Sequence, residues 1–223
     1  MTPRRSAALS LICCLLACDP GAPGSFPPED PVLAGENQAA GDPHRGRFPF
    51  ADAVAGLPES GQLHATLVTD ERPIHCRLHA DVAPLSVATF VGLARGVRPF
   101  LDPETNTWVT RPYYDGLSFH RAYERQFVQG GRLGESGFIG FRLQDEPSIG
   151  SAFDRPGVLA LGNEGRPNTS AAEFFITTEV LRELDGRYTI IGHCDDPLLV
   201  RALEARTLAG ERPRIETITI TRE

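Results

Sequence analysis

One segment of the sequence, FHRAYERQFVQGG at residues 119–131, sets polar side chains among aromatic and aliphatic ones. We interpret it as buried strand, yet Arg121 carries a permanent charge and five donors in a rigid fork. An apolar setting is costly for a guanidinium unless those donors find an acceptor. We therefore predict that the acceptor for Arg121 is supplied by a substrate.

Other kinds of chemistry find little support in the sequence. No Gly-x-Ser-x-Gly motif is present, and no nucleophile stands at a recognisable spacing from a histidine, which disfavours a hydrolase. The segment HCRLH contains residue types that bind metals, but on a strand the imidazoles of His75 and His79 would lie about 13 Å apart. Cys76 would face the opposite side, so no metal site is predicted. Whether Cys76 pairs with Cys194 is left open by the sequence.

The composition excludes one class of partner. The chain has 223 residues and is 41% hydrophobic, which suits one globular domain with additional segments. Its 22 basic residues are all arginine and are outnumbered by 29 acidic residues, giving a net charge of −7. A nucleic-acid surface needs a basic patch, so nucleic acid is not an expected partner.

The first 18 residues predict export. Arg4 and Arg5 precede an apolar run at residues 7–17 that is too short to span a bilayer but fits a secretory signal. The sequence LLAC ending at Cys18 resembles a bacterial lipobox, which predicts lipidation of Cys18. The alternative is a plain signal peptide cleaved at another small residue. The predicted location is the cell envelope, with the protein anchored to a membrane by lipid and facing the periplasm or exterior.

The rest of the chain divides into two parts. Residues 19–60 are rich in Pro, Gly and Ala and are interpreted as a flexible tether with one short helix at 51–55. The ordered domain is predicted at 61–223. Helices are expected from Pro84 to Gly96 and at 197–205, and the segment 97–116 is either a functional loop or a surface insertion. Strands are expected at 63–69, 74–79, 118–123, 126–130, 158–161, 173–177, 189–192 and from Arg214 onward. This order indicates a mainly β barrel or sandwich.

Three segments together point to a known family: FHRAYERQFVQGG, DRPGVLALGNEGRPNTSAAEFFITT and LDGRYTIIGHC. Their order and spacing resemble the cyclophilin-type peptidyl-prolyl cis-trans isomerases across residues 61–223. The resemblance implies a closed eight-stranded antiparallel barrel capped by two α-helices. It also implies that proline-containing polypeptides are the partners.

The resemblance assigns roles to individual residues. Arg121 matches the catalytic arginine, Phe175 the floor of the pocket for the proline ring, and Leu184 a wall of it. Asn163 matches an asparagine whose backbone holds the peptide. The full set of predicted substrate-binding residues is Phe127, Gln129, Gly162, Asn163, Phe175, Leu184 and Tyr188.

The sequence also departs from the family pattern. Gln126 stands where a phenylalanine is usual, so either the neighbouring Phe127 compensates or the pocket is more polar. Glu173 replaces a common glutamine and Glu183 a common tryptophan, and these carboxylates are expected to favour basic peptides. A catalytically weak peptide-binding module or holdase chaperone is therefore the alternative to an isomerase.

The chemistry of the predicted reaction explains why no cofactor motif is needed. An X-Pro bond is a tertiary amide, and its rotation barrier of about 18 to 20 kcal/mol comes from resonance. No covalent bond is made or broken during rotation. An apolar slot, clamps on the backbone and a charged donor near the imide are sufficient for catalysis. The predicted function is X-Pro isomerisation that assists the folding of exported proteins, with no cofactor.

Overall fold

The fold is built on one eight-stranded antiparallel sheet. The computed structural model describes residues 23–146 and 151–223. Eight predicted strands form this sheet close to their expected bounds. In spatial order they are β10 (Ile215–Arg222), β1 (Leu63–Thr69), β2 (Ile74–Leu78), β9 (Ile190–Cys194), β7 (Val158–Leu161), β8 (Phe174–Thr177), β6 (Phe127–Gly130) and β5 (Phe119–Tyr123).

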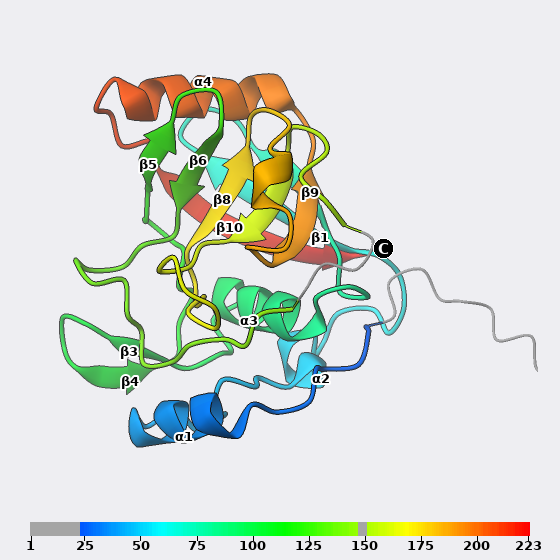
Figure 1. Cartoon of the computed structure of the whole chain (residues 1–223), viewed down its shortest axis with the longest axis vertical. Coiled ribbons are helices and arrows are strands. Elements are labelled where there is room, and N and C mark those ends of the chain that lie inside the picture. The colour runs from blue at the N-terminus through cyan, green and yellow to red at the C-terminus, as the bar shows by residue number, and fades with distance from the viewer. Residues whose placement is uncertain (1–22, 147–150) are drawn as a thin grey trace, which may run out of the picture.

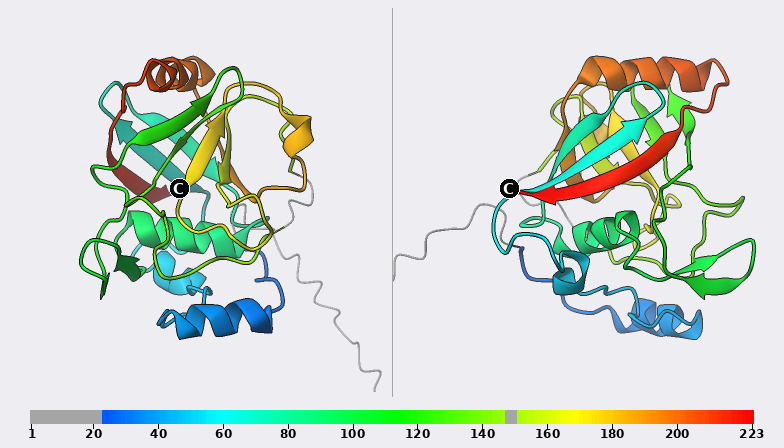
Figure 2. Two further views of the ribbon diagram at one scale, coloured as in Figure 1. Left: turned by 60° about the vertical axis from the view of Figure 1, so that its left-hand side comes forward. Right: turned by 180° about the vertical axis from the view of Figure 1, so that it is seen from behind.

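The sheet is curled but its two edges do not form a continuous ladder (Figure 2). β10 pairs along the whole of β1 and approaches β5 only at its beginning. There the edges meet through an isolated bridge between Ser118 and Arg214. Backbone hydrogen bonds flank this bridge, from the N–H of Phe119 to the carbonyl of Pro213 and from the N–H of Ile215 to the carbonyl of Leu117. The prediction of eight antiparallel strands is confirmed, whereas the closed barrel is not, because the pairing of the two edges is confined to residues 116–119 and 213–215.

Two helices lie at opposite ends of the curled sheet (Figure 1). These are α3 (Pro84–Ala94), which begins at the predicted proline, and α4 (Pro197–Leu208). Alternate residues of the strands fill the space between them; Leu63, Ala65 and Leu67 of β1 are fully buried. Every residue of α3 is buried, because the sheet covers one side of the helix and the N-terminal segment covers the other.

The N-terminal segment differs from the predicted flexible tether. Its described part, residues 23–60, contains α1 (Pro31–Ala39) and α2 (Phe50–Ala53) and packs beneath α3. Asp42 forms an ion pair with Arg98 in which both side chains are 0% exposed. The tether interpretation is therefore wrong for residues 23–60, which are held by buried polar contacts. The predicted signal peptide and Cys18 lie outside the described residues. In the two ranges that the structure covers, no helix combines the length and apolarity needed to cross a bilayer.

Residues 97–116 contain a small hairpin of β3 (Phe100–Asp102) and β4 (Thr107–Val109). Trp108 on β4 packs against Gly41 and Gly140, where an added Cβ would lie 3.0 Å and 2.7 Å from the indole. The hairpin is thus wedged against the N-terminal segment. This contact favours the structural interpretation of the insertion over a functional loop.

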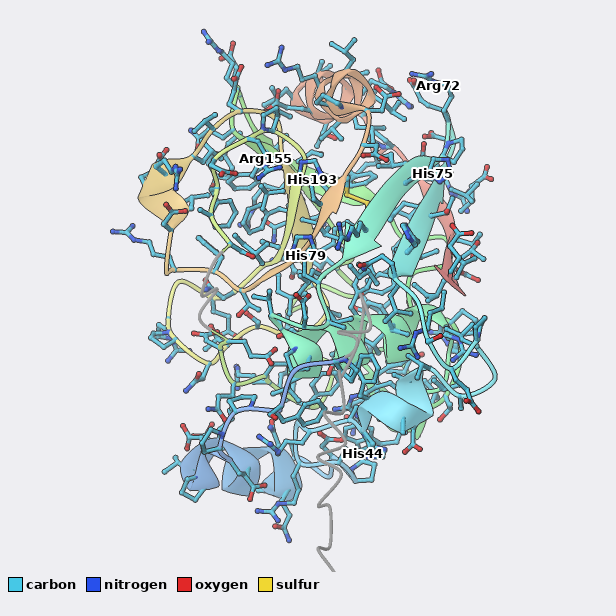
Figure 3. The ribbon with its side chains drawn as sticks, turned by 90° about the vertical axis from the view of Figure 1, so that its right-hand side faces the viewer. His44, Arg72, His75, His79, Arg155 and His193 are labelled. Atoms are coloured by element: carbon cyan, nitrogen blue, oxygen red, sulfur yellow. A yellow bond between two sulfur atoms is a disulfide. The ribbon has the colours of Figure 1, made fainter. Side chains whose placement is uncertain are left out.

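Cys76 and Cys194 form a disulfide between β2 and β9, which settles the pairing that the sequence left open. They are direct partners in the strand register, and both are buried. Figure 3 shows His75 and His79 apart on the outside of the sheet. Within residues 23–146 and 151–223, no three His, Cys, Asp or Glu side chains are grouped to hold a metal ion.

Removal of Glu146 is expected to destabilise α3. The N-cap residue Ala83 has no side-chain acceptor for the first N–H groups of the helix. The carboxylate of Glu146, from a loop distant in the sequence, acts as the acceptor. Its two carboxylate oxygens accept the N–H groups of Leu85 (3.0 Å) and Ser86 (2.7 Å). Because the Glu146→Ala variant leaves these buried donors unsatisfied, its free energy of unfolding should fall by roughly 2 kcal/mol.

Urea denaturation monitored by circular dichroism would measure this loss. Glu59→Ala is the matched control, because Glu59 is an exposed glutamate, and its effect should stay within about 0.5 kcal/mol. Equal stabilities of the two variants would show that Glu146 does not cap the helix.

Candidate active site

The strand register brings the polar residues of the opening motif into one row. Arg121 on β5 lies opposite Gln129 on β6, Gln129 lies opposite Phe175 on β8, and Phe175 lies opposite Ala160 on β7. Directly opposite residues of an antiparallel pair face the same side of the sheet. The row therefore lies on the outer face, whereas Phe174 faces inward and belongs to the hydrophobic core.

A pocket of about 250 Å³ opens above this row. Its lining includes all eight residues predicted for catalysis and substrate binding, and also Tyr123 and Gln126. Tyr123 was missed by the sequence analysis, although it stands two residues after Arg121 and so faces the same side of β5. The complete lining is Arg121, Tyr123, Gln126, Phe127, Gln129, Gly162, Asn163, Phe175, Leu184 and Tyr188.

The floor of this pocket is aromatic. Phe175 is 2% exposed, and its ring centroid lies 4.8 Å from that of Phe127 and 5.1 Å from that of Tyr188. Leu184, at the end of the short helix η1 (Arg182–Leu184), packs against the same cluster. Phe127 thus supplies the aromatic surface that Gln126 cannot, while Gln126 adds a polar side chain to the same lining, so both alternatives for that departure hold in part. The result is a small apolar slot with polar groups on one side.

Arg121 is exposed, so the prediction that it is a buried charge is wrong. It lies on the outer face of β5, next to the edge where the curled sheet stays open. Across the two described ranges, no side chain or carbonyl accepts a hydrogen bond from its guanidinium. The five donors are therefore free to meet a ligand above Gln129 and Phe175.

Glu173 organises the polar side of the site, a role that the sequence did not reveal. Its carboxylate accepts hydrogen bonds from Gln129 Nε2 (2.5 Å) and Arg132 Nε (2.8 Å). His120 Nε2 lies 3.3 Å from Glu173 Oε2, without the alignment of a hydrogen bond.

These contacts determine the charge state of Glu173. Burial alone raises the pKa of the carboxyl, but the contacts with His120 and Arg132 outweigh burial and hold the pKa below its ordinary value. The charge is neutralised locally, since Glu173 is ion-paired and only 15% exposed. Glu183 is exposed on η1 and is not part of the pocket lining. The expectation that these carboxylates select basic peptides is therefore not supported.

Gly162 and Asn163 form the rim after β7. The Asn163 side chain is used internally, donating to the Arg187 carbonyl and accepting the Gly165 N–H. Its backbone N–H and carbonyl have no partner among residues 23–146 and 151–223, so they can bind an extended peptide. A Cβ at Gly162 would lie 3.1 Å from Gln129 Nε2, so the glycine leaves room for this amide to reach Glu173.

Comparison with known proteins agrees with this geometry. The family model for cyclophilin type peptidyl-prolyl cis-trans isomerases matches residues 64–222. The chain belongs to this family. Peptidyl-prolyl cis-trans isomerase A of Mycobacterium tuberculosis is 36% identical over 168 residues, covering 70% of this chain and 91% of that protein. Peptidyl-prolyl cis-trans isomerase B of Streptomyces anulatus is 36% identical over 159 residues, covering 70% of this chain and 89% of that protein.

A solved structure shows the same cyclophilin fold. The cyclophilin type isomerase of Cryptosporidium parvum superposes with a TM-score of 0.58 at 23% identity, covering 73% of this chain and 99% of that one. The same protein has been crystallised in the presence of the dipeptide Ala-Pro, and that structure superposes with a TM-score of 0.56. The predicted family and the mainly β fold are confirmed.

Replacing Glu173 by glutamine should change how the stability of this cyclophilin depends on pH. Because the folded-state pKa of Glu173 is lowered, its stabilisation is fully present above the ordinary glutamate pKa and is lost as the pH falls through the folded-state pKa. The Glu173→Gln variant lacks this pH-dependent stabilisation, because a glutamine side chain does not titrate. Its loss of unfolding free energy between about pH 7 and about pH 3 should be roughly 1 kcal/mol smaller than that of the wild type.

Denaturant titrations at a series of pH values would measure the difference. Glu216→Gln, at an exposed position of β10, provides the control and should follow the wild-type curve. If Glu173→Gln also followed that curve, the carboxylate would not be coupled to its cationic neighbours.

Proposed function

We propose that this cyclophilin accelerates rotation about X-Pro bonds in the pocket above Phe175, with Arg121 as the catalytic residue. The observation that carries the proposal is the row formed by Arg121, Gln129 and Phe175 across β5, β6 and β8. It sets an unpaired cationic donor and a neutral amide beside an apolar slot. That combination is what rotation about a tertiary amide requires.

The chemistry acts on amide resonance. A proline ring in the slot between Phe127, Phe175 and Tyr188 is held while the preceding residue turns. As the bond twists, the imide nitrogen regains a lone pair, and a hydrogen bond from Arg121 to this nitrogen stabilises the twisted state more than the planar one. The donor therefore lowers the barrier without forming a covalent bond.

Gln129 and Asn163 hold the substrate backbone. Gln129 must present its Nε2 to the carboxylate of Glu173, because a carboxylate only accepts hydrogen bonds. This leaves Gln129 Oε1 as an acceptor for a substrate N–H. The backbone of Asn163 adds a strand-like donor and acceptor. Both clamps restrict the flanking residues so that rotation is confined to the X-Pro bond.

The test is isomerisation of a short Ala-Pro peptide by the full chain, followed by exchange NMR. Acceleration that depends on protein concentration would support the isomerase. Binding of the peptide without acceleration would favour the alternative of a peptide-binding module or holdase. If the peptide is neither bound nor isomerised faster, both candidate functions are refuted.

We further propose that the protein acts outside the cytoplasm on newly exported proteins, anchored by lipid at Cys18. The support is the sequence of residues 1–18 and the Cys76 to Cys194 disulfide, which is typical of proteins from an oxidising compartment. Mass spectrometry of the purified protein tests this. A diacylglycerol-modified Cys18 at the new N-terminus is expected, and an unmodified terminus elsewhere would refute the anchor.

A further inference from the structure

Residues 23–60 precede the part of the chain that the family model matches, yet they support one wall of the active-site groove. Asn37 of α1 is 3% exposed and uses both ends of its amide on a single residue. Its Nδ2 donates to the Arg142 carbonyl (2.9 Å), and its Oδ1 accepts the Arg142 N–H (2.8 Å). The backbone at Arg142 is thus fixed in part by the N-terminal segment.

The neighbouring Phe141 is held from the same direction. The guanidinium of Arg98 lies 3.7 Å from the centre of the Phe141 ring, and Asp42 binds that guanidinium through both carboxylate oxygens. Phe141 and Arg142 line a second pocket of about 430 Å³ beside the proline slot. The N-terminal segment therefore positions a wall of the groove that leads away from the catalytic residue.

This groove is continuous with a surface that α1 itself provides. The second pocket shares Arg142 and Thr169 with a third pocket of about 390 Å³, which lies between α1 and residues 166–169. Val32, on the wall formed by α1, is 70% exposed. The second pocket is joined to the proline slot by the shared residues Arg121, Gln129, Gly162, Asn163 and Tyr188.

The charges in the third pocket indicate what it can bind. Glu164 accepts hydrogen bonds from both Arg142 (2.8 Å) and Arg166 (2.9 Å), so the two arginines are already paired and do not form an open anion site. The lining also includes the polar side chains of Asp30, Glu36 and Asn168. Its apolar part is the exposed side chain of Val32 beside Pro167, at the end of a groove that begins at the proline slot. An extended polypeptide that places one apolar side chain on Val32 and Pro167, with its backbone toward the polar residues, matches this surface.

We propose that α1 and residues 166–169 form an additional subsite for the polypeptide that flanks the target proline. The proposal rests on the isomerase function proposed above. With proline in the slot, the flanking chain follows the groove past Arg142, and an apolar side chain contacts Val32. A tetrapeptide fills the slot alone, whereas a longer substrate gains affinity from α1.

The test compares two peptides with the same central Ala-Pro, a tetrapeptide and a dodecapeptide with leucines in its flanks. The full chain and its variants are assayed by exchange NMR, which gives KM and kcat separately. Val32→Ser should raise KM for the dodecapeptide about fivefold and leave the tetrapeptide unchanged. Leu198→Ser is the matched control, because Leu198 on α4 is 73% exposed and lines none of the three pockets.

Asn37→Ala tests the positioning of Arg142 independently. It should also raise KM for the dodecapeptide while kcat for the tetrapeptide stays constant, which a general loss of folding would not produce. If the wild type, Val32→Ser and Asn37→Ala all show the same ratio of KM values for the two peptides, the subsite does not exist. If neither peptide is isomerised by the wild type, the proposed function fails instead.

Discussion

Substitution of Arg121 by alanine is expected to lower kcat for an Ala-Pro peptide by about a hundredfold or more, with a much smaller change in KM. The guanidinium has no acceptor in the described parts of the chain and stands at the open side of the proline slot. Its hydrogen bond to the imide nitrogen exists only when the bond is twisted, so its loss raises the barrier more than it weakens binding. Removing one such donor typically costs about 10² to 10³ in rate.

Exchange NMR measures kcat and KM for this comparison. Arg77→Ala is the matched control, because Arg77 is an exposed arginine on β2, away from the proline slot, and its variant should retain full activity. Arg121→Lys should recover only part of the rate, since an ammonium lacks the planar fork of the guanidinium. An Arg121→Ala variant with wild-type kcat would mean that another group stabilises the twisted imide.

Substitution of Asp42 by alanine should be the most destabilising of the changes considered. Asp42 and Arg98 form a bidentate pair (3.0 Å and 2.8 Å) in which both side chains are 0% exposed. The variant leaves Arg98 buried and without a counter-charge, which costs about 3 to 5 kcal/mol. Urea denaturation should show this loss as a lower midpoint with a similar slope.

Two further variants make the measurement specific. Glu29→Ala breaks an exposed ion pair with Arg45 in the same segment and should cost at most about 1 kcal/mol. Combining Asp42→Ala with Arg98→Met removes the buried charge and should recover part of the lost stability. If Asp42→Ala behaved like Glu29→Ala, the N-terminal segment would not be coupled to the folding of the sheet.

The strands and the proline slot could be predicted from the sequence because they follow simple periodicity. Alternation along a strand places Arg121 with Tyr123, and Phe174 opposite to Phe175, without knowledge of the tertiary structure. The resemblance to cyclophilins then implied that the eight strands form one antiparallel sheet. The exposure of Arg121 was not predictable in this way, because it depends on which side of the sheet the groove lies.

The packing of the N-terminal segment could not be predicted for a different reason. Residues 23–60 have few large apolar side chains and therefore look like a tether by composition. They are anchored instead by single polar residues, Asp42 on Arg98 and Asn37 on Arg142, and such contacts have no periodic signature. The role of Glu173 was hidden likewise, since its partners Gln129 and Arg132 come from a distant part of the chain.

The position of β10 in the sheet has a consequence for biosynthesis. Residues 63–69 pair along one side with residues 215–222, so β1 lacks one of its two neighbours until that late segment has left the ribosome. Native pairing across such a sequence separation is slow to form and cannot start during most of translation. The native sheet can therefore be completed only after β10 has left the ribosome, at the very end of synthesis.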